Sequence, residues 1–238
     1  MPHPAPTGWW RAIGWCVGGY LLALGAGIVY ARSLIAAGEW TKGFPWEHDL
    51  LQAVHAVELP ALADRVVLIL PWFGTNITLL PLSLIAAVWL VRRGQRRVAT
   101  HLIVLQIGTL TLSAVLKALY DRPRPTLWEQ RGQFAWASYP SGHAIAGVAV
   151  LFTIAIMLRR MRGWHWPFWV AGVMLVVSSY SRLYLGVHWP SDVIAGLVIG
   201  VVWLVATLVA FRPAEPAPAT LDSTQVQGEI LKSRKGRA

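Results

Sequence analysis

The sequence predicts an all-α fold in which six helices form a bundle that spans a membrane. The first observation is composition, because 55% of the 238 residues are hydrophobic and only 13% are charged, about half the charged fraction of a typical soluble domain. The second is a series of six apolar stretches, each close to the ~20 residues that cross a bilayer. The third is the presence of 14 tryptophans, which concentrate at membrane–water interfaces. A chain this apolar has ample surface to bury, which excludes disorder of the whole chain.

Each expected helix follows from one of these stretches. The first carries no charged residue over 13–30, and no clean Ala-x-Ala site follows it, so we expect a retained helix and not a cleaved signal peptide. Pro71 and Pro81 blur the start of the second, which lies near position 76 or as early as 66. The fourth and fifth are short for complete spans. In chain order, the expected spans are 13–30, 76–91, 98–116, 143–158, 166–180 and 193–211.

The formal net charge of +10 indicates how the bundle is oriented. With six spans, one side collects 13 Lys and Arg residues and three acidic residues, whereas the other side collects eight of each. Loops rich in Lys and Arg stay in the cytoplasm, so we expect both termini there, in a plasma (inner) membrane. Since the basic residues lie in short loops against the membrane, the charge does not predict a nucleic-acid partner.

Three further segments accompany the spans. We expect residues 1–12 to form a cytoplasmic N-terminus, 13–211 to form one membrane domain, and 212–238 to form a disordered cytoplasmic tail, because that end is rich in Pro, Ala and polar residues. The segment 49–67 mixes Leu and Val with charged residues. This pattern predicts a helix lying in the periplasmic or extracellular interface. Tryptophans near span ends, Trp189 among them, are expected to anchor the bundle at the membrane surface.

A first polar cluster follows the third span at its outer end. Lys117, Arg122 and Arg124 place three cations within eight positions, and Pro123 and Pro125 prevent the helix from continuing. Fixed cations this close together repel one another unless an anion lies between them. The alternative is that these side chains simply extend from a helix end toward water.

A second cluster, Pro140 to His143, leads into the fourth span. Gly142 permits close approach of the backbone, Ser141 can cap the helix, and the free N–H groups of a helix start bind phosphate well. His143 then lies beside that phosphate site. The alternative is an ordinary helix cap with an incidental histidine.

A third cluster joins the fifth and sixth spans. Arg182 offers a planar donor group suited to phosphate oxygens, and Asp192 follows His188 by four residues. A carboxylate that binds one imidazole nitrogen leaves the other nitrogen free as a nucleophile or base. The alternative is an interfacial histidine together with an aspartate favoured by the helix dipole.

The expected topology places all three clusters at outer helix ends. Together they supply cations, two histidines, one carboxylate and a glycine-containing helix start. These are the groups that phosphoryl transfer by positioning and electrostatic stabilisation requires.

The three strings resemble the signature of the type 2 phosphatidic acid phosphatase superfamily. They read Lys-x6-Arg-Pro from Lys117, Pro-Ser-Gly-His over 140–143, and Ser-Arg-x5-His-x3-Asp from Ser181 to Asp192, in the family's order and spacing. The six-span layout is similar to the family's integral-membrane branch, and the resemblance covers 13–211.

The resemblance implies a role for each matching residue. His188 would attack phosphorus and form a phosphohistidine, Asp192 would orient it, and His143 would protonate the leaving oxygen and later activate water. The phosphate oxygens would be held by Lys117, Arg124, Ser141, Gly142 and Arg182. Arg122 lies outside the shared pattern, and its contact with substrate stays open.

The resemblance further implies a phosphatase that needs no metal or other cofactor. The sequence lacks a clustered Asp/Glu set for Mg²⁺ and paired His and thiolate ligands for zinc. The expected substrate is a membrane lipid of the undecaprenyl pyrophosphate, phosphatidylglycerophosphate or phosphatidate type. A lipid phosphotransferase using the same site is the main alternative, and a non-catalytic scaffold or transporter is a further one. Vanadium haloperoxidases share the site, but they are soluble and six spans argue against them.

Overall fold

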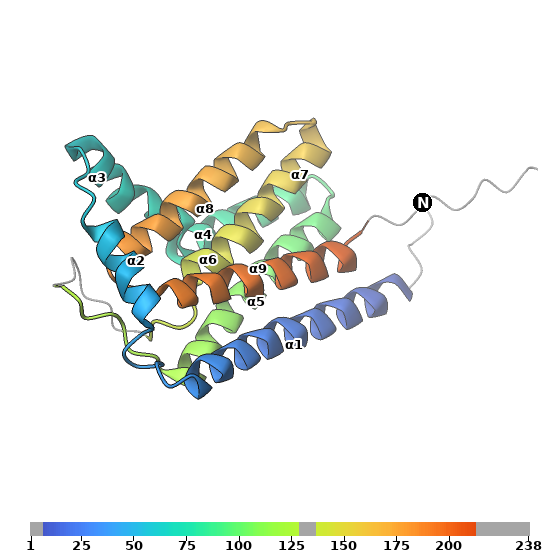
Figure 1. The fold of residues 1–238 in the computed structure, drawn as a ribbon. Coiled ribbons are helices and arrows are strands. Elements are labelled where there is room, and N and C mark those ends of the chain that lie inside the picture. The colour runs from blue at the N-terminus through green and yellow to red at the C-terminus, as the bar shows by residue number, and fades with distance from the viewer. Residues whose placement is uncertain (1–6, 129–136, 213–238) are drawn as a thin grey trace, which may run out of the picture.

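A computed structural model describes residues 7–128 and 137–212. Every regular element in these two ranges is helical, which confirms the all-α prediction (Figure 1). The short elements η1 and η2 are a 3₁₀ turn and a π-helical turn. In chain order the elements are α1 (Thr7–Ala36), α2 (Pro45–His55), α3 (Ala61–Ile69), η1 (Leu70–Gly74), α4 (Asn76–Arg92), α5 (Arg96–Tyr120), α6 (Gly142–Ala146), η2 (Gly147–Leu151), α7 (Phe152–Arg162), α8 (Trp166–Tyr184) and α9 (Pro190–Ala210).

Four helical segments in the described ranges are long and apolar enough to cross a membrane. They are Trp9–Ala36, Arg96–Tyr120, Gly142–Arg162 and Pro190–Ala210. A fifth is added when Ala61–Gly74 and Asn76–Arg92, which meet at a bend of 46°, are counted as one span. The fifth expected span, 166–180, corresponds to α8, which does not meet the same criterion. Six spans therefore stay a prediction.

The single interfacial helix expected over 49–67 is wrong. The structure has two helices there, because α2 ends at His55 and α3 begins only after Pro60. A proline in a helix interior is unfavourable, since it lacks an N–H donor and its ring clashes with the preceding turn, and Pro60 instead stands at the N-cap of α3. The second half of the segment instead belongs with α4, to which α3 and η1 connect through the bend.

The interior of the bundle forms mainly between α1, α5, α6, η2 and α9. Its fully buried side chains include Leu105, Leu112, Leu116, Ile145 and Ile199. Glycines bring these helices close together. A Cβ on Gly108 would come within 2.2 Å of the Trp203 ring, so α5 and α9 can pack at this distance only because the side chain is absent.

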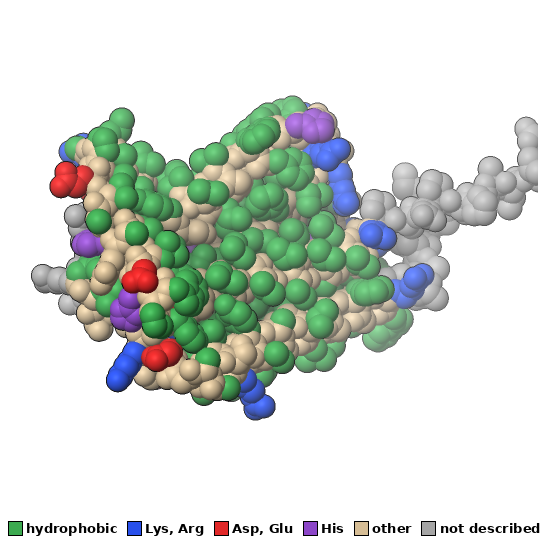
Figure 2. Space-filling model, in the orientation of Figure 1, with side chains coloured by type: hydrophobic (Ala, Val, Ile, Leu, Met, Phe, Trp, Pro, Cys, Tyr) green, Lys and Arg blue, Asp and Glu red, His purple; other side chains and the backbone are tan. Residues whose placement is uncertain are grey.

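This arrangement gathers four helix termini at one end of the molecule. The C-terminal ends of α5 and α8 and the N-terminal ends of α6 and α9 lie at the end of the molecule that also holds α2, whereas α1 begins and α9 ends at the opposite end (Figure 1). Lys and Arg side chains are visible at both ends, whereas all the acidic side chains visible in this view lie at the first end (Figure 2). Hydrophobic side chains cover most of the surface between the two ends (Figure 2).

Candidate active site

The three polar clusters of the sequence meet around one cavity of about 380 Å³. Ser141 and Asp192 lie just behind its wall and are buried. The other six residues expected to act on phosphate line the cavity: Lys117, Arg124, Gly142, His143, Arg182 and His188.

Backbone carbonyls fix the first two cations against the wall. Lys117, in the last turn of α5, donates through Nζ to the carbonyl of Ala137 and, at 3.3 Å, to that of Ser138. Arg124 donates through Nη1 to the carbonyl of Val187. Burial lowers the pKa of the Arg124 guanidinium, and the charge of Asp192 opposes that effect, but an arginine remains charged at neutral pH.

The N-terminus of α6 presents its backbone to the cavity. Ser141 donates its N–H to the carbonyl of Asp192 at 3.0 Å, and its own carbonyl accepts the N–H of Ile145 at 3.1 Å. The expected side-chain cap is not formed, because Ser141 Oγ makes no capping bond and is buried without a hydrogen-bond partner. A Cβ on Gly142 would lie 3.2 Å from Ser113 Oγ, so glycine leaves room at this corner.

A glycine of α9 lets α6 approach so closely. A Cβ on Gly196 would lie 2.6 Å from the carbonyl oxygen of Ser141 and 2.8 Å from the Ala144 Cβ. Backbone atoms cannot rotate away as a flexible side chain can. The position of the α6 N-terminus therefore depends on a residue with no side chain on the facing helix.

Arg182 has one donor with no partner. The residue is buried near the end of α8, and its Nη2 donates to Ser181 Oγ at 2.9 Å. Its Nε is buried without a hydrogen-bond partner. An unsatisfied buried donor costs roughly 1–3 kcal/mol or more when charged, so an oxygen atom bound in the cavity would relieve that cost.

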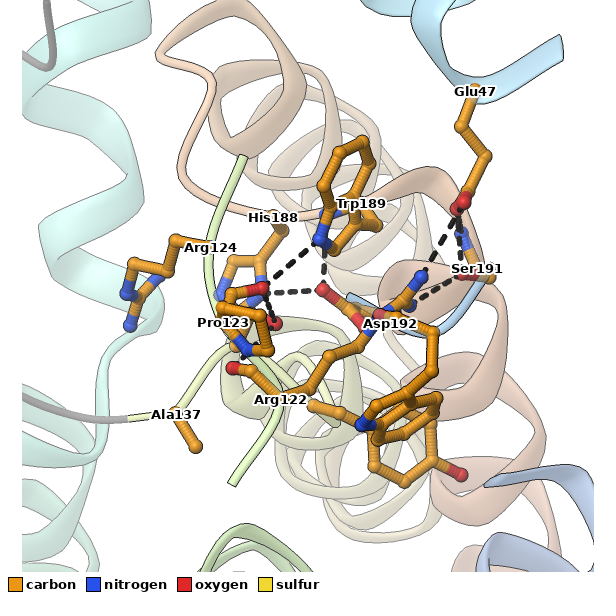
Figure 3. Close-up of polar contacts among 12 residues, drawn as sticks. Glu47, Arg122, Pro123, Arg124, Ala137, His188, Trp189, Ser191 and Asp192 are labelled. Carbon is orange, nitrogen blue, oxygen red and sulfur yellow. Dashed lines mark hydrogen bonds and ion pairs between the residues drawn. The ribbon is translucent and has the colours of Figure 1, made fainter. Parts of the chain in front are cut away.

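His188 and Asp192 face each other at the base of the cavity. His188 Nδ1 lies 3.6 Å from Asp192 Oδ2, which also accepts the N–H of Trp189 at 2.9 Å. Burial lowers the pKa of His188 to about 4, and the nearby Asp192 carboxylate only partly opposes this shift. The ring is consequently neutral at pH 7. Figure 3 shows His188 between Arg124 and Asp192.

Trp189 is not an interface anchor, contrary to expectation. Its side chain is 2% exposed, and its Nε1 donates to the carbonyl of Pro123 at 3.0 Å. This bond ties the start of α9 to the segment that carries Arg124. The tryptophan between His188 and Asp192 in the sequence therefore supports the cavity from within the protein.

His143 completes the group from the first turn of α6, on the same cavity as His188. Within residues 7–128 and 137–212, no three His, Cys, Asp or Glu side chains form a group that could hold a metal ion.

Sequence reasoning missed one wall of the cavity and the support behind it. The missed lining comes mainly from the bend between η1 and α4, where Pro71 and Pro81 obscured the start of a helix. Gln106 Nε2, on α5, donates to Asn76 Oδ1 in this wall at 3.2 Å. The lining residues without a prior assignment are Trp72, Thr75, Asn76, Ile77, Ser113 and Val187.

Arg122 does not line the cavity. It lies on the far side of Asp192 with Glu47 and Ser191, both of which the sequence left unassigned (Figure 3). Ser191 could have been suspected from its place directly before Asp192. Glu47 carries no motif, and only the fold brings it to the site.

The amino-acid sequence of this chain is similar to a known protein family and to several of its members. Residues 98–215 match the model of the PAP2 superfamily. An undecaprenyl-diphosphatase of Sulfolobus acidocaldarius is 28% identical over 171 residues, which cover 70% of this chain and 78% of the relative. A putative undecaprenyl-diphosphatase of Escherichia coli is 30% identical over 143 residues, which cover 57% of this chain and 68% of the relative.

A solved structure shares the fold. The transmembrane PAP2-type phosphatidylglycerolphosphate phosphatase of Bacillus subtilis superimposes with a TM-score of 0.67 at 22% sequence identity. The match covers 85% of this chain and 98% of that chain. The arrangement of helices around the cavity is thus one that a membrane phosphatase also adopts.

Proposed function

Because the chain belongs to the PAP2 superfamily, we propose that it is an integral membrane phosphatase that hydrolyses a lipid phosphate or lipid diphosphate through a phosphohistidine. The observation that carries this proposal is the single cavity in which two histidines face a ring of cations. Similarity to diphosphatases and to a phosphatidylglycerolphosphate phosphatase supports a lipid substrate.

In the first step, His188 attacks phosphorus. Its Nδ1 faces Asp192, which leaves Nε2 with a free electron pair for the phosphoryl group. A bond forms between Nε2 and phosphorus while the bond from phosphorus to the leaving oxygen breaks. His143 donates a proton to that oxygen, which releases the lipid alcohol or lipid monophosphate.

In the second step, water cleaves the phosphohistidine. His143, now neutral, takes a proton from the water as its oxygen bonds to phosphorus, and the bond between phosphorus and His188 breaks. Inorganic phosphate leaves and both histidines return to their starting forms. In both steps the transferred oxygens would be held by Lys117, Arg124, Arg182, the hydroxyl of Ser141 and the amide of Gly142.

We propose that this reaction needs no metal ion. Lys117, Arg124 and Arg182 converge on one cavity, and such a group can stabilise the charge on a transferring phosphoryl group directly. Activity in excess chelator should equal activity in its absence, whereas a chelator-sensitive rate restored by a divalent cation would contradict this part of the proposal.

The topology we propose has six spans, both termini in the cytoplasm of an inner-membrane protein, and the cavity at the outer end. Support comes from α8, which begins next to the end of α7 and ends at the cavity that α6 opens onto. Its 19 residues extend about 28 Å, close to the thickness of the hydrocarbon layer. Residues 13–211 would form the membrane domain. Of the expected tails, 1–6 and 213–238 lie outside the described residues.

The bend before α4 would admit the lipid. Trp72 and Ile77 line the cavity yet are 59% and 75% exposed, so they connect the polar site with the lipid-facing surface. A substrate could then bring its phosphate to the cations while its tail remains in the outer leaflet. Purified protein that hydrolysed only water-soluble phosphate esters would contradict this mode of access.

The deciding experiment measures phosphate release from a panel of lipid phosphates. The panel holds a phosphatidate, a phosphatidylglycerophosphate, undecaprenyl phosphate and undecaprenyl diphosphate, with His188→Ala as the matched inactive control. Release from at least one lipid by the wild type alone supports the proposal. A radiolabelled donor reveals the alternative, because label appearing on an added lipid acceptor and not in free phosphate would identify a phosphotransferase.

A further inference from the structure

Arg122 is completely buried, yet it does not reach the phosphate cavity. Its Nη1 donates to Asp192 Oδ1 and to Ser191 Oγ, each at 2.7 Å, and its Nε donates to the carbonyl of Trp40 at 2.9 Å. The guanidinium also lies over the rings of Trp40 and Trp189, at 4.8 Å and 5.5 Å from their centres. A charge removed from water this completely is tolerated only when it is paired and hydrogen-bonded.

The second partner of this arginine is Glu47, from the first turn of α2. Glu47 is itself fully buried, and its Oε2 lies 3.4 Å from Arg122 Nη2 and accepts the N–H of Phe44 at 2.9 Å. Its Oε1 accepts both the N–H and the hydroxyl of Ser191, at 3.0 Å and 2.5 Å. Each carboxylate oxygen is therefore engaged, and α2 is attached to the start of α9 by charged hydrogen bonds.

The contacts form a row of alternating charge that ends at the nucleophile. Glu47 pairs with Arg122, Arg122 pairs with Asp192, and Asp192 faces His188 (Figure 3). Without the arginine, the carboxylates of Glu47 and Asp192 would occupy the same buried region around Ser191 with no cation between them. Two such carboxylates disfavour each other's charged form.

We propose that Arg122 and Glu47 are positioning residues of this active site: Arg122 keeps the Asp192 carboxylate charged and aimed at His188, and Glu47 holds Arg122 in place. The proposal rests on the proposed function, in which His188 is the nucleophile. It makes α2 part of the catalytic apparatus, and it assigns to Arg122 an effect on turnover and not on phosphate binding.

Other charged or titratable groups surround Asp192, and the test must separate Arg122 and Glu47 from them. Lys117 and Arg124 line the cavity and would bind substrate, so their removal should raise KM. The groups that interact electrostatically with Asp192 are Tyr30, Lys117, Arg122, Arg124, Tyr139 and His188, and Glu47 lies behind them as the partner of Arg122.

The test compares Arg122→Met, Glu47→Gln and the double variant, with Arg32→Met as the control. Arg32 is an exposed arginine in the last turns of α1, so its loss should leave the kinetics unchanged. For Arg122→Met we expect kcat to fall by roughly 10- to 100-fold, a range typical of coupled groups in one buried network, with KM within about twofold of wild type. Glu47→Gln should lower kcat less.

The pH dependence of kcat separates a positioning role of Arg122 from a purely structural one, because loss of a structural contact alone would not shift it. Removing the cation should shift the acid limb of kcat to higher pH, by about one unit, and removing the Glu47 charge should shift it to lower pH. The double variant should be faster than Arg122→Met alone, since the uncompensated carboxylate is gone.

Several outcomes would overturn the inference. A tenfold rise in KM with unchanged kcat would make Arg122 a substrate ligand. Acid limbs identical to wild type, or a double variant no faster than Arg122→Met, would show that the charges are not coupled to the nucleophile. If Arg122→Met does not fold, the direction of the shift in Glu47→Gln decides alone. A wild-type protein that is inactive on every lipid phosphate would refute the proposed function. An active wild type, with variants whose kcat and pH profile equal those of the wild type, would refute this inference only.

Discussion

At the scale of single residues, the groups on the cavity differ in what already holds them. Lys117 and Arg124 are fixed by backbone carbonyls, whereas Arg182 Nε and Ser141 Oγ are buried without partners. The first pair supplies charge at a set position before any ligand arrives. The second pair supplies donors that no protein group in the described residues satisfies, which leaves them available to a bound group. Such preorganised donors stabilise charge that develops during phosphoryl transfer.

The two histidines should therefore fail in different ways when they are replaced. His188→Ala removes the nucleophile, so we expect turnover to fall by roughly a thousandfold or more and no labelled protein to form. His143→Ala removes the proton donor and the base that activates water, which contributes about 10²–10⁴-fold. With a radiolabelled substrate, His143→Ala should accumulate phosphoenzyme. Full activity in both variants would contradict the assignment.

The protonation of His188 sets an expectation for the pH dependence. Because burial lowers its pKa to about 4, the free enzyme holds a neutral nucleophile down to roughly pH 5, and kcat/KM should fall only as pH approaches 4. The unfolded chain takes up this proton near pH 6.5 and the folded chain does not. The free energy of unfolding should therefore decrease as pH is lowered from 6.5 to 4.

The measurement is kcat/KM from pH 4 to pH 8, with the ionisation of the substrate phosphate determined separately and divided out. A corrected acid limb near pH 6.5 would mean that the nucleophile is not desolvated in the way that its buried position implies.

At the scale of elements, the sequence predicted helix ends best where proline or glycine marks a terminus. Pro123 and Pro190 bracket the ends that carry the motifs, and α5 and α9 begin and end within a few residues of the expected spans. The region 49–67 could not be predicted equally well. Its charged residues are spread over two helices, and the burial of Glu47, just before this region, depends on a partner 144 positions away in the chain.

The contact between α6 and α9 provides a test at this scale. Gly196→Ala would put a methyl group 2.6 Å from the carbonyl oxygen of Ser141, so α6 must move away. Overpacking of this kind costs roughly 1–3 kcal/mol, and it displaces the Gly142 amide that would hold phosphate. We expect lower thermal stability together with a raised KM.

Gly172→Ala is the matched control for this change. Gly172 also lies in a helix, α8, but a Cβ there would meet no atom within 4 Å. Thermal unfolding and phosphate release measured on both variants should separate them clearly. If the two variants behaved alike, the seating of α6 on α9 would not govern the phosphate site.

At the scale of the whole molecule, the two ends of the bundle carry different kinds of charge. One end presents solvated Lys and Arg side chains beside the start of α1 and the end of α9 (Figure 2). The other end also has exposed cations such as Lys42, but in addition it buries Arg122 between two carboxylates and lines a cavity with Lys117, Arg124 and Arg182. If the bundle has the six-span topology that we propose, the whole net charge of +10 belongs to the cytoplasmic side, and the cavity end is neutral overall.

This division makes the membrane orientation measurable. Cys16 is the only cysteine in the sequence, so its replacement by Ala gives a background in which single cysteines can be placed at Lys42→Cys and Arg160→Cys. Both positions are exposed, Lys42 at the end with the cavity and Arg160 near the end of α7 at the opposite end.

A membrane-impermeant maleimide applied to intact cells should label Lys42→Cys and not Arg160→Cys, because loops rich in Arg remain in the cytoplasm. Permeabilised cells should label both, which controls for reactivity. Labelling of Arg160→Cys alone in intact cells would reverse the orientation and place the phosphate site in the cytoplasm.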